Sequence, residues 1–400
     1  MQTSDDPRQL KEEAARLTAS LADELFAVSR SLYDDPELSL EEVRAARHLT
    51  EILDRENFQV TRGVAHLPTS FVAVARGSRP GPALAILAEY DALPGLGHGC
   101  GHNLIATSAL GAGQVLGRLR HRLPGEIRII GTPAEETGGG KVLMLQEGIF
   151  EGLDAAMMIH PGTEFRVYTN SLACQLIEVV FEGKSSHAVA APDRGVNALD
   201  PLVQLYVGID ALRKGLTGEV RIPGVIVEGG KRPNLVPERA VGLFSVRARN
   251  RVAVEAILDR IARMAHGLAG ASGARVSFRR LEETYDEMLT NSILAGLFKE
   301  NLRALGEETN DSPRDRMGSL DMGNVSHVVP ALHAYVAIVP PSGALHTREF
   351  AEATVSEQGK RGLLMAVQAL SMTAIDLLAR PGLLAAARSE FLAATGRGAA

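Results

Sequence analysis

The sequence predicts an α/β protein whose parallel-rich sheet domain is interrupted by a smaller α+β domain. The chain has 400 residues, 45% of them apolar, which is more than one ordinary hydrophobic core holds, so two domains are expected. Up to about residue 169, short apolar runs alternate with helical patterns, as in a sheet covered by helices. Between residues 172 and 281 the order becomes β-α-β-β-α-β, which is that of a ferredoxin-like unit.

The first 60 residues predict helices. Apolar side chains recur there at helical spacing: Leu17, Leu21, Leu25 and Val28. The run Asp34-Asp35-Pro36 ends this pattern, because proline cannot continue a helix. Ser39-Leu40-Glu41-Glu42 matches a capping box and is expected to open the next helix.

Four buried strands are expected next, because each is a short apolar run: 71–75, 83–88, 127–131 and 155–159. Helices at about 104–120 and 141–147 separate the last three runs. Strands joined through helices favour a largely parallel sheet, and the carboxyl ends of such strands are where sites are usually built.

The inserted unit follows as a complete pattern of its own. Its expected elements are a strand at 172–181, a helix at 196–214, strands at 220–227 and 240–248, a helix at 252–268 and a strand at 274–281. We therefore assign residues 170–285 to an inserted ferredoxin-like domain. Residues 1–169 and 286–400 are assigned to the main domain, which ends in long helices at 350–378 and 383–394.

Composition excludes several classes of protein. The net charge of −6 is mixed in sign along the chain, and no Trp is present, so neither a nucleic-acid stripe nor an aromatic stacking platform is expected. The charged N-terminal segment has no apolar signal region, and no run of 18 apolar residues occurs, so no membrane association is expected. Two cysteines, Cys100 and Cys174, fit a reducing compartment, which predicts a cytoplasmic location.

Residue types that bind metals follow three of the expected strands. They are Glu89-Tyr90-Asp91 with His98-Gly99-Cys100-Gly101-His102, then Pro133-Ala134-Glu135-Glu136, and then His160, and His346 lies in a later loop. The glycines beside Cys100 let the backbone curl tightly, so Cys100 and His102 can point at one centre. Thiolate and imidazole are good ligands for Zn²⁺ and similar ions. Of two adjacent glutamates, one can bind metal while the other faces a water as general base.

Each of these residues also has a purely structural interpretation. Asp91 could form a turn, Glu135 and Glu136 could cap the following helix, and Cys100 could be an inert core thiol. A nucleophilic dyad of Cys100 and His102 is disfavoured, because residues two apart in a tight turn are poorly placed and the glutamate pair stays unexplained. Since three successive strands each end in such residues, their joint occurrence favours a metal site.

These residues belong to a longer series of motifs that spans nearly the whole chain. The motifs are Asp35-Pro36-Glu37-Leu38-Ser39, Glu89-Tyr90-Asp91-Ala92-Leu93-Pro94, His98-Gly99-Cys100-Gly101-His102-Asn103, Pro133-Ala134-Glu135-Glu136, His160-Pro161-Gly162, Gly183-Lys184-Ser185-Ser186-His187-Ala188, Pro233-Asn234-Leu235-Val236-Pro237, Asp321-Met322-Gly323-Asn324-Val325-Ser326 and His346-Thr347. In this order they resemble the M20 metallopeptidase family, in the branch with amino-acylase-like and aminobenzoyl-glutamate hydrolase-like enzymes. The resemblance implies a zinc-peptidase-like catalytic domain with an inserted ferredoxin-like dimerisation (lid) domain.

The resemblance also implies roles for individual residues. The implied metal ligands are Cys100, His102, Glu136, His160 and His346. They would hold two divalent ions, Zn²⁺ or Mn²⁺ with Co²⁺ as a further option, and Cys100 would bridge them. Glu135 would be the general base, and Asp91 would orient the site from behind its ligands. His187 would reach the oxyanion from the partner subunit, although a histidine at a strand end is otherwise an ordinary surface residue.

Asn234 and Arg247 are the candidates for substrate binding. Asn234 resembles the substrate-contacting Asn of the family, and Arg247 lies on a strand from which it could aim at a carboxylate, or simply be solvated. Two metal ions leave the pocket net positive after its anionic ligands are counted, which favours substrates with a carboxylate beside the amide. Two departures, Glu89 where many members have His and Asn103 where relatives often have Asp, point to the dipeptidase-like and aminobenzoyl-glutamate-like subgroup.

The expected function is hydrolysis of the amide bond of N-acyl amino acids, dipeptides or aryl-amide conjugates of amino acids, by a metal-activated water with Glu135 as base. The alternative is a metal-dependent aminohydrolase that releases ammonia from an aromatic or small amine. A non-catalytic binding protein is disfavoured, because Glu135 and every implied ligand are present. A homodimer through residues 170–285 is expected from His187 and from a sheet edge that would otherwise be exposed.

Overall fold

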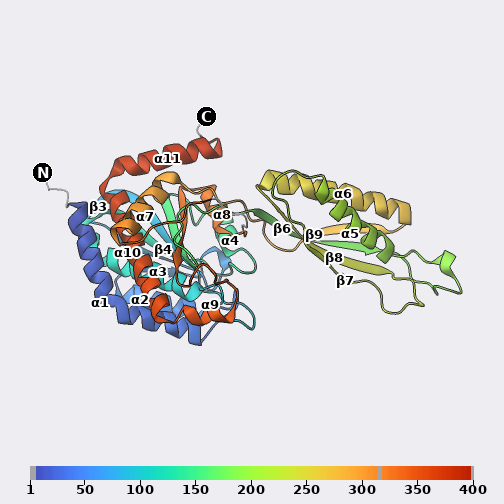
Figure 1. Ribbon diagram of the computed structural model, residues 1–400, viewed down its shortest axis with the longest axis horizontal. Helices are drawn as coiled ribbons and strands as arrows, with labels where there is room; N and C mark the ends of the chain where they lie inside the picture. Colours follow the sequence, from blue (N-terminus) through green and yellow to red (C-terminus); the bar gives the residue numbers. More distant parts are fainter. Residues whose placement is uncertain (1–5, 313–317, 398–400) are drawn as a thin grey trace. The chain divides into compact units, whose positions relative to one another are not determined.

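The computed structural model describes residues 6–312 and 318–397, and these form two compact units (Figure 1). Unit 1 is built from the residues up to Asn170, the segment that begins at Met288, and the chain from Asn324 onward. Unit 2 is built from Ser171–Glu287 together with a short segment that ends at Gly323. Each unit has a hydrophobic core of its own, so each is described separately.

A six-stranded mixed sheet lies at the centre of unit 1. In spatial order its strands are β1 (Gln59–Arg62), β2 (Phe71–Arg76), β4 (Pro124–Gly131), β3 (Arg79–Ala88), β5 (Ala155–Gly162) and β10 (Ala331–Ala337). The last four run parallel to one another, whereas β2 pairs antiparallel with both of its neighbours, β1 and β4. Residues 83–88 of β3 are all buried, because helices cover both faces of the sheet. This burial on both sides explains why the strands are continuous apolar runs in the sequence.

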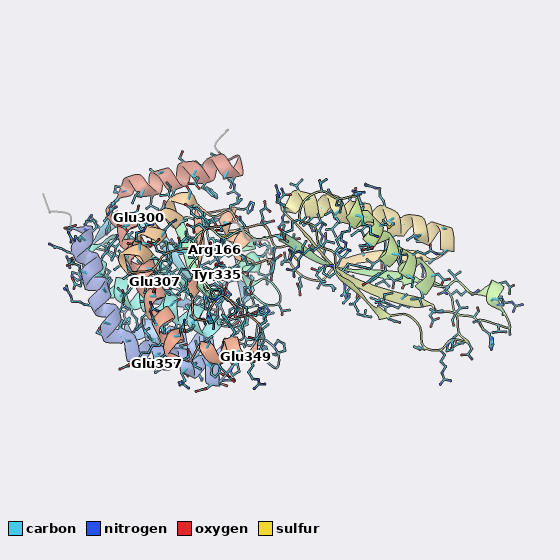
Figure 2. All side chains as sticks on the ribbon, in the orientation of Figure 1. Arg166, Glu300, Glu307, Tyr335, Glu349 and Glu357 are labelled. Atoms are coloured by element: carbon cyan, nitrogen blue, oxygen red, sulfur yellow. The ribbon has the colours of Figure 1, made fainter. Side chains whose placement is uncertain are left out.

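Helices surround this sheet. They are α1 (Pro7–Asp34), α2 (Val43–Arg55), α3 (His102–Leu119), α4 (Gly140–Gln146), α7 (Ser292–Ala304), α9 (Arg348–Ala353), α10 (Glu357–Ala379) and α11 (Pro381–Thr395), and a short helix α8 (Met322–Ser326) follows the break in the described chain. The helix α3 is buried along almost its whole length, between the sheet and the helices α1 and α10. A mutual backbone bridge between Arg166 and Tyr335 joins the segment after β5 to β10. Both residues are labelled in unit 1 in Figure 2.

The helix α10 is the one helix in the described part of the chain that has the length and composition to cross a membrane. However, 78% of its most apolar window is buried inside the structure. It packs there against α1, α3 and α7, so its apolar character is that of a core helix.

Two expectations about helix ends are wrong. The predicted capping box at residues 39–42 does not form. The helix α2 begins at Val43, so its N-cap residue is Glu42, and the side chain of Glu42 makes no capping hydrogen bond. The carboxylate of Glu37 accepts the amides of Arg44 and Ala45 instead, both at 2.8 Å. Ser39 is occupied by a tertiary partner, since its hydroxyl donates to Asp91 Oδ2 at 2.8 Å. A contact distant in sequence has replaced the local cap.

The single long helix expected at 350–378 is also divided. The helix α9 ends at Ala353, and α10 begins after Ser356, whose hydroxyl accepts the amide of Gly359 at 3.1 Å. Ser356 is therefore an N-cap in the middle of an apolar pattern that is otherwise helical throughout.

Unit 2 is a four-stranded antiparallel sheet in the order β7 (Gly224–Glu228), β8 (Arg239–Ala248), β6 (Ala173–Glu182) and β9 (Arg275–Arg280). The helices α5 (Leu199–Lys214) and α6 (Arg251–Ser272) share its core. Side chains along β6 alternate between buried and half-buried, as expected for a sheet with helices on one face. The strand order and the β-α-β-β-α-β connectivity are those of a ferredoxin-like fold.

Candidate metal centre

Two potential ligands lie in a glycine turn that leads from β3 toward α3. Gly101 has a φ of +85°, and a Cβ at this position would lie 2.4 Å from Pro161 Cγ, so only glycine fits. The turn places Cys100 just before the helix and makes His102 its first residue. The Nδ1 atom of His102 lies 2.9 Å from both the carbonyl oxygen and Oδ1 of Asp91. With its proton held there, His102 presents Nε2 to the site.

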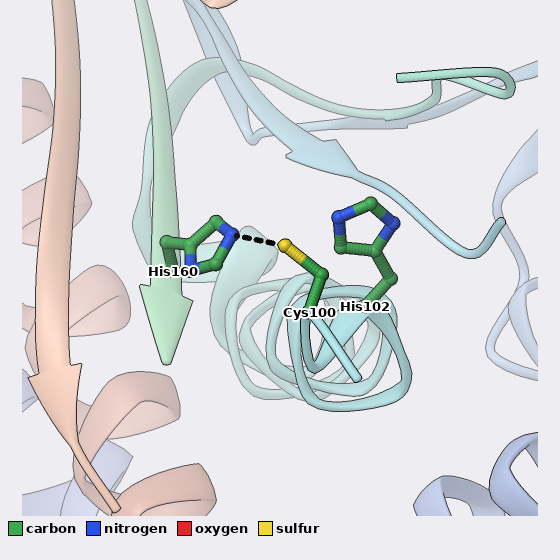
Figure 3. A group of neighbouring side chains, drawn as sticks. All are labelled: Cys100, His102 and His160. Carbon is green, nitrogen blue, oxygen red and sulfur yellow. Dashed lines mark hydrogen bonds between the residues drawn. The ribbon is translucent and has the colours of Figure 1, made fainter. Parts of the chain in front are cut away.

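A third ligand comes from the neighbouring strand. His160, on β5, places Nε2 at 3.3 Å from Cys100 Sγ (Figure 3). Its Nδ1 donates to the carbonyl of Pro161 at 2.7 Å. Cys100, His102 and His160 are all buried, and one potential ligand atom from each lies within 4.8 Å of the others. The carboxyl ends of β3 and β5 therefore bring a thiol and two imidazoles together.

The remaining potential ligands come from the loop after β4 and from the loop before α9. Ala134, with a φ of 60°, turns the chain so that Glu135 and Glu136 follow at the sheet edge. His346 is held by its amide, which donates to the carbonyl of Gly99 at 2.9 Å. Two further groups of ligand atoms each lie within 4.8 Å: Cys100 with Glu136 and His346, and His102 with Glu135 and Glu136. Cys100, His102 and Glu136 thus each belong to two groups.

This donor set suits divalent metal ions. The Nε2 atom of His102 and Oε1 of Glu136 are both buried without a hydrogen-bond partner in the described structure, although they face each other at 3.7 Å. Buried polar atoms are seldom left in this state unless something else satisfies them. A cation between them would do so, and sulfur, nitrogen and oxygen donors at these spacings match the ligands of Zn²⁺ and related ions.

The electrostatics of the site also call for a cation. Burial raises the pKa of the Cys100 thiol far above its ordinary value, so a thiolate at this position needs positive charge beside it. Burial, with the neighbouring His333 and His102, lowers the pKa of His160 to about 3, so this ring stays neutral and keeps a lone pair for a metal. Burial would raise the pKa of Asp91, but the adjacent His102 outweighs it and holds that carboxyl ionised.

Two buried acids lie next to this centre: Glu89, which the sequence places in the first group of metal-binding residue types but without a role of its own, and Glu42, which the sequence did not identify as part of the site. Glu89 at the end of β3 forms an ion pair with Lys141 of α4, with Oε1 and Nζ 2.6 Å apart, and both side chains are almost fully buried. Glu42 accepts the amide of Ala134 and the hydroxyl of Thr69, both at 2.9 Å. Nothing in the sequence indicates that Lys141, in the first turn of α4, or Glu42, just before α2, is buried, because lysine and glutamate at such positions are usually exposed.

The other predicted site residues lie in unit 2. His187 is exposed, forms a bridge to Leu235, and accepts the amides of Val189 and Ala190 through Nδ1. Asn234 is near it, since its carbonyl accepts the amide of Ala188 at 3.0 Å. Arg247, on β8, donates to Ser245 and Ser319.

A thiol, imidazoles and carboxylates at the carboxyl edge of a parallel-rich sheet form the donor set of a metal-dependent hydrolase, and the carboxylate of Glu135 lies among them. The model of peptidase family M20/M25/M40 matches residues 85–370, and the chain belongs to this family. It is a hydrolase that acts on amide bonds, and its site is one for divalent metal ions.

Similar proteins span nearly the whole chain. The chain is 37% identical to the Xaa-Arg dipeptidase of Mus musculus, over 96% of this chain and 92% of that protein. It is 27% identical to one of the subunits of the p-aminobenzoyl-glutamate hydrolase of Escherichia coli (strain K12), over 91% of each. A dinuclear metal binding peptidase of family M20 from Bacillus subtilis has a TM-score of 0.70, with 22% identity over 90% of this chain and 99% of that one. These relatives confirm the predicted fold and family.

Proposed function

We propose that this chain cleaves the amide bond of a small substrate that carries a carboxylate, with dipeptides as the first candidates ahead of N-acyl amino acids and aryl-amide conjugates of amino acids. The proposal depends mainly on Cys100, which belongs to two groups of potential metal ligands, one with His102 and His160 and one with Glu136 and His346. Glu135 lies beside them, in a group with His102 and Glu136. The preference for dipeptides rests on the 37% identity to an Xaa-Arg dipeptidase over nearly the full length.

The residues that would hold the metal ions are Cys100, His102, Glu136, His160 and His346. Two divalent ions bound there would lower the pKa of a coordinated water and polarise the carbonyl of the substrate. Zn²⁺ suits the thiolate and imidazoles on affinity, and Mn²⁺ or Co²⁺ would serve where supply decides. Asp91 fixes the tautomer of His102 through Nδ1, and this keeps Nε2 available as a ligand.

Glu135 is the residue that would move the proton. Its side chain is largely buried, and its Oε2 atom lies 4.0 Å from His102 Nε2, so it reaches the place where a water would be activated. It would accept a proton from the attacking water and return it to the nitrogen of the leaving amine. Its neighbour Glu136 also faces His102, at 3.7 Å, but in addition lies 3.8 Å from His346 Nε2, and this second contact supports Glu136 as the ligand and Glu135 as the base.

We also infer that two copies of the chain associate through unit 2. Large apolar side chains are exposed on α5 and on the edge strand β7: Val203, Tyr206, Val207, Val225 and Val227. The helix and the strand adjoin, because the hydroxyl of Tyr206 donates to the carbonyl of Gly224 at 2.8 Å. A second copy would cover both the apolar patch and the strand edge. His187, Asn234 and Arg247 would then bind the substrate and its oxyanion, in a dimer that works in the cytoplasm.

A hydrolysis screen with mass-spectrometric detection tests the reaction. Purified protein would be loaded with Zn²⁺, Mn²⁺ or Co²⁺ and offered dipeptides with and without C-terminal arginine, N-acyl amino acids, aryl-amide conjugates of glutamate and aspartate, and aromatic amines. Chelator-sensitive release of an amino acid supports the proposal. Release of ammonia from an amine would instead establish the aminohydrolase alternative.

Substitution of the base tests the mechanism. Glu135→Gln should lower kcat by about 10²–10⁴-fold, which is the usual contribution of a positioned general base, while metal content stays unchanged. Glu147→Gln, an exposed acid farther along the same segment, is the matched control and should keep wild-type activity. Near wild-type turnover by Glu135→Gln would refute the assignment.

A further inference from the structure

The ion pair between Glu89 and Lys141 has no part in the proposed mechanism, yet it is buried beside the metal centre. The side chain of Lys141 is 0% exposed and that of Glu89 is 2% exposed. Desolvation of two charges is costly, and well-packed apolar residues often replace such pairs with no loss of stability. Stability alone therefore does not account for the pair.

The carboxylate of Glu89 uses only one oxygen for this pair. Oε1 accepts from Lys141, whereas Oε2 is buried without a hydrogen-bond partner in the described structure and lies 3.6 Å from His102 Nε2. The Nδ1 atom of His102 is engaged by Asp91, so Nε2 is the ring atom that His102 can offer to a metal ion, through the lone pair that it carries in this tautomer. Two lone-pair atoms that face each other in a buried site repel, unless a proton or a cation lies between them.

The separation fits a shared metal ion. Oxygen and nitrogen ligands bind zinc at about 2.0–2.2 Å in near-tetrahedral geometry, which puts two ligand atoms about 3.3–3.6 Å apart. The distance from Glu89 Oε2 to His102 Nε2 is 3.6 Å, slightly shorter than the 3.7 Å from Glu136 Oε1 to the same nitrogen. Glu89 is therefore placed at least as well as Glu136 to bind an ion at His102.

We propose that Glu89 is a further ligand of the metal ion held by His102, and that Lys141 positions it by holding its other oxygen. This proposal rests on the proposed metal-dependent function. Because Lys141 cancels the charge of Glu89, the pair would donate an oxygen while adding no net negative charge to the centre. The site would thus keep the positive potential that a substrate carboxylate requires.

The test removes both charges together, so that no unpaired charge stays buried. The double variant Glu89→Gln/Lys141→Met would be compared with wild type for zinc content by elemental analysis and for zinc affinity by chelator competition. Loss of a hydrogen bond behind a ligand usually weakens metal binding by 10–100-fold. For a true ligand we expect one of the two ions to bind more than about 100-fold more weakly.

The matched control is Asp54→Asn/Arg62→Met, an exposed ion pair elsewhere in unit 1, which should bind zinc as wild type does. A folded double variant of Glu89 and Lys141 that keeps both ions at wild-type affinity would overturn the proposal. A wild-type protein that binds no divalent ion would instead show that the proposed function itself is wrong.

The single variant Lys141→Met gives a second and independent result, which matters if the double variant does not fold. It frees the second oxygen of Glu89, whose charge is then compensated only when metal is bound. Zinc should therefore raise its melting temperature by more than it raises that of wild type. A purely structural role for the pair gives an equal or smaller zinc-induced shift, and that outcome would also overturn the proposal.

Discussion

Glu42 holds the loop that carries the proposed base, and its replacement by leucine tests how much the site depends on this contact. The carboxylate is fully buried, and its Oε1 atom accepts the amide of Ala134, the residue just before Glu135. Ala134 has a φ of 60°, a conformation that an alanine adopts only when its surroundings impose it. In Glu42→Leu this amide stays buried and has no acceptor.

The magnitudes follow from these contacts. An unsatisfied buried amide costs about 1–3 kcal/mol, and each kcal/mol corresponds to about 2–4 °C in domains of 150–250 residues. A fall in melting temperature of about 2–12 °C is therefore expected. The variant should lose more activity than its modest loss of stability suggests, because a displacement of the base by about 1 Å lowers the rate roughly 10²-fold.

The assay is steady-state hydrolysis of the best substrate, together with thermal unfolding at saturating metal. We expect kcat of Glu42→Leu to fall at least about 10-fold while KM changes little, since Glu42 does not reach the substrate. Glu41→Leu, an exposed neighbour, is the control and should match wild type. A variant that melts lower but keeps kcat within about twofold of wild type would refute the view that Glu42 positions the base.

Three further predictions concern residues around the same centre. Asp91→Asn should weaken metal binding by about 10–100-fold in a chelator competition, because it removes the charge that orients His102, and unchanged affinity would contradict this role. Gly101→Ala should lower both stability and metal content, since its Cβ would meet Pro161 at 2.4 Å, and wild-type levels of both would show that the turn tolerates a side chain. Burial raises the pKa of Tyr90 well above its ordinary value of 10.0 while its hydroxyl donates to Thr69. A raised folded-state pKa means that this stabilisation is complete below pH 10 and is lost as the pH rises further. Melting curves of Tyr90→Phe between pH 8 and 11 should therefore start lower and fall less steeply than those of wild type, and parallel curves would exclude this source of alkaline instability.

Much of the fold and of the ligand cluster could be predicted, because the signals were local. The strands of unit 1 that are buried on both faces are continuous apolar runs, and the glycines around Cys100 mark a tight turn. Strand β1 was not anticipated, because Gln59–Arg62 is a short and mostly polar edge strand with little apolar pattern. Local periodicity does not reveal such a strand.

The contacts behind the ligands could not be predicted, because they join segments far apart in sequence. Ser39 and Glu42 match a capping pattern, but they bind Asp91 and Ala134 instead. Lys141 has the local sequence of an exposed helix residue, and only the fold places it against Glu89. In each case a tertiary partner overrode the usual local preference of the residue, which no pattern in a single sequence records.

The order of the ligand segments has a consequence during protein synthesis. Cys100, His102, Glu136 and His160 all precede unit 2 in the chain, whereas His346 follows it. At about 5–20 residues per second, a ribosome makes His346 roughly 10–40 s after His160. Under the proposed ligand assignment, a nascent chain would therefore lack His346 while unit 2 is being translated, and the full set of metal ligands would assemble only after the segment with His346 has been made. Metal would then bind fully only to chains that have been translated beyond unit 2. A chain that ends within unit 2 would bind metal more weakly and would be easier to degrade.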